Sequence, residues 1–339
     1  MVLHNKISAQ ELKKRMENDT VERTTISFYK YHLIENPQQF RDLFYQQLSA
    51  LGVMGRIYVA TEGINAQISV PTENFESLKT VIYGHDFLNG IRLNIAVDNR
   101  THSFFKLAIK VKRKIVADGI TDKTFDVTKI GKHLKAEEFN ALTDREDVVI
   151  VDMRNHYESE VGHFENAILP DVDTFREQLP LVAKMLDDKK DKPVVMYCTG
   201  GIRCEKASAY MLHKGFSEVY QLEGGIIEYA RQVKAKGLTN KFHGKNFVFD
   251  ERLSESISDD VIAKCHQCGA PFDLHTNCAN VACNLLFIQC PACREKYDNC
   301  CSDECKTIAA LPEEAQKELR KGKNFGRLVY KKGRKLKTV

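Results

Sequence analysis

The cysteines are the residues of this chain best suited to chemistry, and they fall into two groups. Cys198 and Cys204 lie near the middle of the chain, whereas the other nine of the eleven cysteines lie between Cys265 and Cys305. The segment 1–20 is too polar to contain the apolar core of a secretory signal. In a chain without an export signal, such a cluster favours metal-bound thiolates over disulfides.

The first group lies in a loop that could activate a thiol. Cys198 directly follows an apolar stretch, 193–197, that predicts a buried strand, and Arg203 opens a helical pattern. The residues between them are Thr199, Gly200, Gly201 and Ile202. The glycines let backbone N–H groups turn inward, and the positive end of the following helix points toward the loop. We therefore expect an anion cradle that lowers the pKa of Cys198 and makes it a nucleophile, with Arg203 adding charge. An inert cysteine at a strand end is the alternative.

Other polar residues near this loop have two interpretations each. Asp152 and Arg154 follow a second apolar stretch, and we favour a pair that orients the loop over a catalytic acid and base. Cys204, six positions after Cys198, could be a resolving thiol or could pack inward. His163 follows Gly162 and is better explained as a turn or packing residue than as a general base.

The second group of cysteines predicts metal sites. Cys-x-x-Cys spacing places two thiolates at adjacent corners of a tetrahedron, so two such turns complete a zinc site. The simplest pairing joins Cys265, Cys268, Cys290 and Cys293, and leaves Cys278, Cys283, Cys305 and one of Cys300 or Cys301 for a second site. Consecutive pairing, ligation by His266 or His275, and an iron–sulfur cluster are the alternatives. We expect two structural zinc ions, because so short a segment has little else to hold it folded.

The elements before the reactive loop form two further regions. Residues 25–116 follow the order strand, helix, strand, strand, helix, strand, which is typical of a ferredoxin-like or acylphosphatase-like sandwich with two helices on one face of an antiparallel sheet. Residues 136–236 alternate helices with fully apolar strands, which indicates a parallel α/β sheet. The predicted fold class is thus multidomain, α+β followed by α/β, with a cysteine-rich module and a basic tail. The predicted boundaries are 1–21 extension, 22–118 ferredoxin-like domain, 119–142 linker, 143–238 α/β domain, 239–260 linker, 261–310 cysteine-rich module and 311–339 basic tail.

Two basic segments predict a surface that binds phosphate. Apolar residues in 105–115 alternate with Lys106, Lys110, Lys112 and Lys114, as in a strand with one apolar and one basic face. Residues 306–339 hold eleven Lys or Arg against three Glu, among them Arg334 and Lys335. We expect both segments to contact phosphate groups, although a solvated outer face explains the lysines equally well.

Length and composition exclude several classes of protein. At 339 residues, 43% of them hydrophobic and 28% charged, the chain has material for two or three domains and is neither globally disordered nor collagen-like. No apolar run approaches the roughly 18 residues of a membrane helix. We expect a cytoplasmic protein with no membrane partner.

The middle of the chain resembles rhodanese domains. The resemblance rests on Val151-Asp152-Met153-Arg154, on Gly162-His163-Phe164-Glu165-Asn166-Ala167, and on Cys198 to Arg203. It implies a cysteine that accepts sulfur as a persulfide. Four residues separate Cys198 from Arg203, whereas related phosphatases have a longer loop, so a phosphatase is disfavoured.

The whole chain resembles the bacterial tRNA uridine hydroxylase family. This resemblance rests on the segments Gly55–Ala66 (GRIYVATEGINA), Cys198–Lys206 (CTGGIRCEK) and Cys290–Cys293 (CPAC). The resemblance implies oxygen-dependent conversion of wobble uridine to 5-hydroxyuridine, with Cys198 as the active cysteine, tRNA rather than DNA as the partner, and molecular oxygen and a reductant as co-substrates. A sulfurtransferase that passes sulfur from Cys198 to an acceptor such as tRNA, and a non-enzymatic RNA-binding scaffold, are the alternatives.

Overall fold

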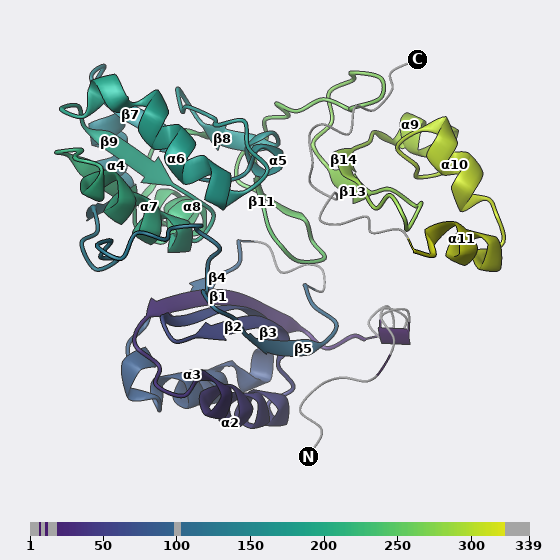
Figure 1. Cartoon of the computed structure of the whole chain (residues 1–339), viewed down its shortest axis with the longest axis horizontal. Coiled ribbons are helices and arrows are strands. Elements are labelled where there is room, and N and C mark those ends of the chain that lie inside the picture. The colour runs from purple at the N-terminus through teal and green to yellow at the C-terminus, as the bar shows by residue number, and fades with distance from the viewer. Residues whose placement is uncertain (1–6, 8–10, 13–18, 98–102, 323–339) are drawn as a thin grey trace.

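The computed structural model describes residues 7, 11–12, 19–97 and 103–322. Figure 1 shows three parts: an N-terminal sheet with its helices, a central α/β part, and a smaller module near the C-terminus. Most of the predicted extension 1–21, and Arg334 and Lys335 of the predicted basic tail, lie outside the described residues.

The N-terminal part is a five-stranded sheet with two helices on one face (Figure 1). Its elements are β1 (Arg23–Tyr31), α2 (Pro37–Ala50), β2 (Met54–Ala60), β3 (Gly63–Pro71), α3 (Phe75–Tyr83), β4 (Asn94–Ile95) and β5 (Leu107–Val111). The helix α2 begins with Pro37, which needs no N–H bond in the first turn, and the Asn36 side chain caps it by accepting from the Gln39 N–H at 3.1 Å. The apolar face of β1 carries Ile26 and Phe28 into the core beneath the helices.

The last strand of this sheet differs from the prediction. The order is β4-β1-β3-β2-β5, so the strand that completes the ferredoxin-like pattern is β4, and β5 is an addition at the opposite edge, parallel to β2. The strand β5 pairs with residues 55–59 of β2 and ends at Val111, so it is shorter than the expected 105–115, and the last bond to β2 runs from the Lys112 N–H to the Val59 carbonyl at 2.8 Å. Lys112 and Lys114 therefore lie outside the strand. Lys114 is half-buried and donates to Asp118 at 2.6 Å, so its place on an exposed basic face was predicted wrongly.

The central part is built on a parallel sheet with the order β6-β10-β9-β7. Its elements are β6 (Lys132–Leu134), α4 (Ala136–Thr143), β7 (Val149–Asp152), α5 (His156–Ser159), β8 (Gly162–Phe164), α6 (Phe175–Met185), β9 (Val194–Tyr197), α7 (Ile202–His213), β10 (Val219–Leu222) and α8 (Gly225–Lys236). All four residues of β9 are buried, as the continuous apolar run predicted. The strand β6 and all of α4 except its last residue, Thr143, lie within residues 119–142, which we expected to be a linker.

The chain after α8 returns to the central part instead of leaving it. The strand β11 (Phe242–Phe247) pairs with β8 and with β12 (Ser254–Ser256), and both new strands lie within the predicted linker 239–260. The cysteine-rich module follows, with β13 (His275–Asn277), β14 (Leu286–Ile288), α9 (Pro291–Lys296), α10 (Asp303–Ala309) and α11 (Glu313–Arg320). A buried cluster that includes Tyr157, Phe247 and Ile288 joins the module to the central part.

Among the described residues, none of the helices combines the length and apolar character required to cross a bilayer.

Candidate functional site

The Cys198 loop lies between the end of β9 and the start of α7, as the sequence predicted. The Gly201 N–H donates to Cys198 Sγ at 3.2 Å, and Gly201 has a φ of +98°, which favours glycine. The first amides of α8 hold the loop from outside: the Ile226 N–H donates to the Cys198 carbonyl at 3.0 Å, and the Ile227 N–H donates to the Thr199 carbonyl at 3.2 Å. The loop is therefore fixed on both sides of the sulfur.

The surroundings of Cys198 favour its thiolate. Burial alone would raise the pKa of this fully buried thiol, but a hydrogen bond from the Cys204 thiol, the charge of Arg203 and the backbone N–H groups of Cys204 and Arg203 together lower the pKa to about 6. Burial and the hydrogen bond to Cys198 raise the pKa of Cys204 well above its usual range. Near neutral pH, Cys198 is thus an anion and Cys204 is a neutral donor beside it.

The closest hydrogen-bond partner of the Arg203 guanidinium is Glu158. Its guanidinium donates to both carboxylate oxygens of Glu158, at 2.6 and 2.8 Å, and the Glu158 side chain is fully buried. Its Nη2 also lies 3.4 Å from Thr199 Oγ1. The charge of Arg203 reaches Cys198 through space, while its hydrogen bonds hold the loop against α5.

Asp152 and Arg154 form a fully buried ion pair, and the Arg154 guanidinium also lies over the ring of Tyr197, the residue before Cys198. Arg154 Nη2 donates to Asp152 at 2.6 Å and to the Gly162 carbonyl at 2.6 Å. Gln178 Nε2 donates to the backbone carbonyls of both residues, at 2.8 and 2.9 Å. These contacts fit a positioning role. His163 Nδ1 is 2.9 Å from the Ser159 carbonyl, a local packing contact.

The N-terminal sheet covers the Cys198 loop, which the sequence analysis did not foresee. Alternation along β1 places Ser27, Tyr29 and Tyr31 on the face opposite the helices. The Tyr29 hydroxyl donates to Glu205 at 2.9 Å, and the Tyr31 hydroxyl donates to the Ile202 carbonyl at 3.3 Å. A Cβ on Gly201 would lie 2.8 Å from the Tyr29 hydroxyl oxygen, so this close approach also requires glycine.

A buried ion cluster beside the Cys198 loop joins the N-terminal part to the central part. Lys206 Nζ donates to both carboxylate oxygens of Glu62, each at 2.9 Å, and also to Asp118. Lys206 is almost fully buried and lies on α7, whereas Glu62 lies in the turn between β2 and β3. Two of the segments on which the family resemblance rests, 55–66 and 198–206, thus meet in space at this ion pair.

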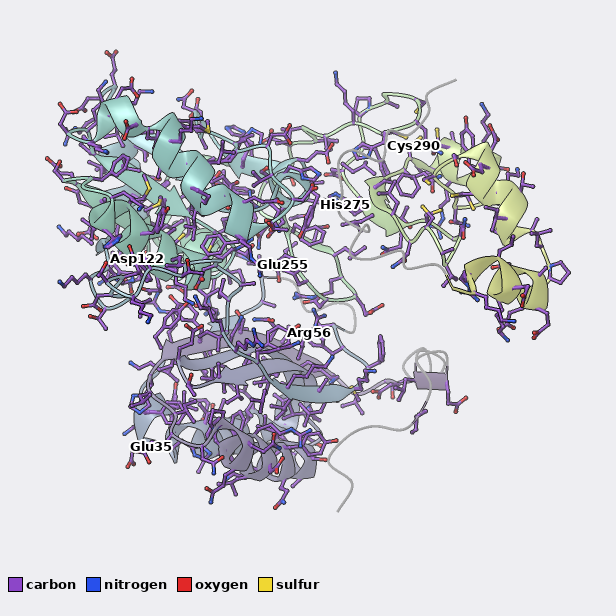
Figure 2. The ribbon with its side chains drawn as sticks, in the orientation of Figure 1. Glu35, Arg56, Asp122, Glu255, His275 and Cys290 are labelled. Carbon is purple, nitrogen blue, oxygen red and sulfur yellow. The ribbon has the colours of Figure 1, made fainter. Side chains whose placement is uncertain are left out.

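The segment 247–255 closes another side of the site. The Thr199 hydroxyl is 3.5 Å from the Phe247 carbonyl, and Arg56 Nη2 donates to the Phe249 carbonyl at 3.1 Å. Figure 2 shows Arg56 and Glu255 where the N-terminal sheet meets this segment. The loop that carries Cys198 is therefore packed among three regions that are distant in sequence.

The cysteine-rich module holds two four-cysteine groups. The groups are Cys265, Cys268, Cys290 and Cys293, and Cys278, Cys283, Cys301 and Cys305, and the sulfur atoms of each lie within 4.8 Å of one another. A tetrahedral zinc site with Zn–S distances of about 2.3 Å needs sulfur atoms about 3.8 Å apart. The Sγ–Sγ distances are 3.6 Å for Cys268–Cys290 and 3.7 Å for Cys283–Cys301. Both groups fit a zinc ion.

The structure distinguishes the alternatives that the spacing left open. Cys301, not Cys300, joins the second group, so the inclusion of Cys300 among the metal ligands is corrected. Cys301 Sγ lies 3.7 Å from the sulfur atoms of both Cys283 and Cys305, and its backbone N–H donates to Cys278 Sγ at 3.4 Å. His266 and His275 belong to neither group. His266 Nε2 instead lies 2.7 Å from Glu160 of the central part.

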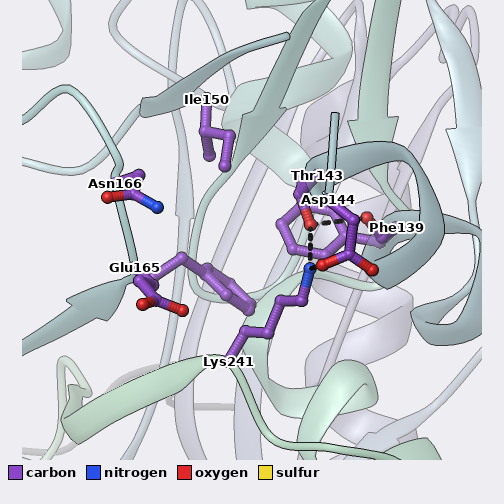
Figure 3. Close-up of a pocket in the computed structure, with 8 residues that line it drawn as sticks. Phe139, Thr143, Asp144, Ile150, Glu165, Asn166 and Lys241 are labelled. Carbon is purple, nitrogen blue, oxygen red and sulfur yellow. Dashed lines mark hydrogen bonds and ion pairs between the residues drawn. The ribbon is translucent and has the colours of Figure 1, made fainter. Parts of the chain in front are cut away.

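A small cavity of about 150 Å³ lies between α4 and β8 (Figure 3). Lys241 crosses it, and its Nζ donates to Thr143 Oγ1 at 3.1 Å and to Asp144 at 2.6 Å. The lining residues are Phe139, Thr143, Asp144, Ile150, Phe164, Glu165, Asn166 and Lys241. The cavity shares no residue with the Cys198 loop, and the charge of Lys241 is already neutralised.

Known families and proteins are similar to this chain along nearly its whole length. Three family models match, namely the UPF0176 acylphosphatase-like domain at residues 23–115, the rhodanese-like domain at 135–232 and the rhodanese C-terminal domain at 243–306. The chain is similar to a protein of Pectobacterium carotovorum named tRNA uridine(34) hydroxylase, with 60% identity over 99% of this chain and 95% of that one. Proteins with the same name from Photorhabdus laumondii and Cronobacter sakazakii are 60% and 59% identical, each over 98% of this chain and over 95% and 96% of their own lengths.

Proposed function

The chain belongs to the tRNA uridine(34) hydroxylase family, and we propose from this membership that it replaces the hydrogen at C5 of uridine 34 in tRNA by a hydroxyl group, with Cys198 as the reactive residue. The observation that carries the proposal is similarity at 60% identity along 99% of the chain, joined to a loop built around one low-pKa thiol. The chain is accordingly an enzyme.

The overall reaction is a two-electron oxidation of the base. One oxygen atom of dioxygen enters the C5–O bond, and the other leaves as water after a reductant supplies two electrons and two protons. A thiolate that adds to C6 of a uracil ring increases the electron density at C5, the carbon that gains oxygen. This is the contribution that we assign to Cys198.

The buried position of Cys198 requires the target nucleotide to be brought to it. An unpaired nucleotide in an RNA loop can leave its stack at a small cost, and enzymes that act on a base use this freedom. We propose that uridine 34 enters between the Cys198 loop and the face of β1 that carries Tyr29 and Tyr31. Entry of the base requires the Tyr29 and Tyr31 hydrogen bonds across this interface to open, and the bound base then excludes water from the thiolate.

We propose that the edge of the N-terminal sheet contributes to tRNA binding. Lys106, Lys110 and Lys112 are exposed, whereas Lys114 is paired with Asp118 and is left out of the proposal. Replacing the three exposed lysines by Ala should weaken tRNA binding. The slope of log K against log salt concentration should become less negative by roughly two to three, because three phosphate contacts are lost. A triple variant at the exposed Lys184, Lys192 and Lys214 is the control. An unchanged slope in the first variant would remove these lysines from the interface.

We propose that the two cysteine groups each hold a structural zinc ion. Four thiolate ligands leave no open position on the metal, so the ions serve the folding of the module and not the oxidation. The module in turn contacts the site: Ile288 packs in one cluster with Phe247, whose carbonyl faces Thr199. The zinc sites thus support one wall of the reaction centre.

The proposed activity is tested in a deletion strain. Nucleosides from its tRNA, separated by mass spectrometry, should lack 5-hydroxyuridine, and expression of this chain should restore it with an ¹⁸O label when cells grow under ¹⁸O₂. Loss of thiouridine with intact 5-hydroxyuridine would instead indicate the sulfurtransferase. No change in either nucleoside would indicate a non-catalytic RNA-binding protein.

A further inference from the structure

Asn94 lies beside the Cys198 loop although it comes from the N-terminal sheet. Its strand, β4, pairs with β1 so that Asn94 is the partner of Ser27, on the face that covers the loop. Asn94 Nδ2 lies 3.5 Å from the Gly200 carbonyl, two residues after Cys198. Only 4% of Asn94 is exposed.

One half of the Asn94 amide has no partner. Its Oδ1 is buried and accepts no hydrogen bond from any described residue. A buried carbonyl without a donor is unfavourable, and an apolar residue of similar size would avoid the penalty. The Gly200 carbonyl can pair only with the Nδ2 end of the amide, so Oδ1 is the end that remains available to a ligand.

Further unpartnered groups occur on the two strands next to the segment that contacts Thr199. Asn246 is fully buried and neither end of its amide has a partner, and its neighbour across β11 and β12, Glu255, has one unpartnered carboxylate oxygen. The residue after Asn246 is Phe247, whose carbonyl faces Thr199. Unsatisfied polar atoms thus occur on Asn94, which contacts Gly200, and on Asn246, the residue before the one that contacts Thr199.

From these contacts we infer that Asn94 reads the target base, with its Oδ1 accepting the N3–H of uracil. The inference rests on the proposed function and adds the residue that selects the base. Uracil carries a hydrogen on N3 in its ordinary neutral form, whereas N3 of cytosine is an acceptor. An oxygen held by Gly200 in this way favours uridine over cytidine and over N3-methyluridine.

The substitution Asn94→Leu tests this role, because it keeps the approximate volume and removes both polar ends. Its stability should change little, because the unsatisfied Oδ1 is lost together with the 3.5 Å contact from Nδ2 to the Gly200 carbonyl. A matched control is Asn65→Leu. Asn65 also faces the interface, but its amide is satisfied at both ends, by the Ile115 carbonyl at 3.4 Å and by Gln67 Nε2 at 2.5 Å. The control should lose stability and keep its preference for uridine.

The measurement is the affinity of the purified full-length protein for three anticodon stem–loop RNAs that differ only at position 34, with uridine, N3-methyluridine or cytidine. The wild-type protein should prefer uridine by about tenfold, the usual effect of one hydrogen bond, and Asn94→Leu should bind all three alike. Asn94→Ala provides the same comparison if the leucine variant does not fold, as judged by its melting curve.

A wild-type protein that does not distinguish the three RNAs, or an Asn94→Leu protein that keeps the preference, would overturn the role of Asn94. Failure of the proposed function is a different result: 5-hydroxyuridine would persist in the deletion strain.

Discussion

Removing the thiol of Cys204 should raise the pKa of Cys198. The Cys204 side chain donates a hydrogen bond to Cys198, and it is one of the influences that lower this pKa from its ordinary value of 9.0 to about 6. A hydrogen bond to a charged group contributes about 1.5–3 kcal/mol, which corresponds to roughly one to two pH units. In Cys204→Ala the pKa of Cys198 should therefore lie between about 7 and 8.

The consequence is a change in reactivity with a calculable size. At pH 6.5 the thiolate fraction of Cys198 is about 76% for a pKa of 6, and between about 24% and 3% for a pKa of 7 to 8. Because only the thiolate is alkylated, the labelling rate at pH 6.5 should fall roughly 3- to 25-fold in Cys204→Ala. Below the pKa the rate rises with pH, and above it the rate is constant.

The assay follows alkylation of the peptide that contains Cys198 by mass spectrometry between pH 5 and 9. Cys204→Ser, which keeps a hydrogen-bond donor at the same position, is the matched control and should keep the midpoint close to that of the wild-type protein. A wild-type midpoint near 9, or the same midpoint in wild-type and Cys204→Ala proteins, would refute this explanation of the reactive thiol. Faster labelling of Cys204 than of Cys198 would refute it as well.

Three further predictions concern the supports of the site. Arg203→Ala leaves the buried carboxylate of Glu158 without its cation and should lower the free energy of unfolding, measured by urea titration, by about 3–5 kcal/mol. An unchanged free energy of unfolding would mean that Arg203 does not stabilise the fold. Lys206→Met should cost a similar amount, about 3–5 kcal/mol, because Glu62 and Asp118 lose their shared cation, and the exposed Lys214→Met should change stability by less than about 0.5 kcal/mol. Elemental analysis should find two zinc ions per chain in the wild-type protein and in Cys300→Ser but one in Cys301→Ser, and the reverse order would mean that the second group is wrongly assigned.

The parts of the site that are local in sequence could be predicted from it. Residues 193–203 contain an apolar strand, two glycines and the start of a helix, which is sufficient to predict a loop that binds an anion. In the same way, Cys-x-x-Cys spacing predicts thiolate metal sites. The structure contains the loop and both four-cysteine groups. Such features are determined by neighbouring residues, whose separation is fixed by the covalent chain.

The contacts between distant segments could not be predicted. Tyr29, Tyr31 and Asn94 lie on short or ordinary amphipathic strands, and nothing in their spacing shows that the polar face of this sheet packs against another domain instead of water. Which of the adjacent residues Cys300 and Cys301 joins the metal group depends on the local backbone conformation, because neighbouring side chains point in different directions. One of these contacts had an indication in the sequence. Glu62 and Lys206 carry opposite charges, and both lie in segments on which the family resemblance rests, so their pairing could have been predicted.

The central claim is that Cys198 is the reaction centre for hydroxylation of uridine 34. The most direct measurement is the amount of 5-hydroxyuridine in tRNA from a deletion strain that expresses Cys198→Ser at the level of the wild-type chain. A serine hydroxyl keeps nearly the same volume but stays protonated near neutral pH, so the variant should fold and bind tRNA normally and form no 5-hydroxyuridine. Full restoration of the nucleoside by Cys198→Ser would contradict the claim and would place the chemistry elsewhere in the protein.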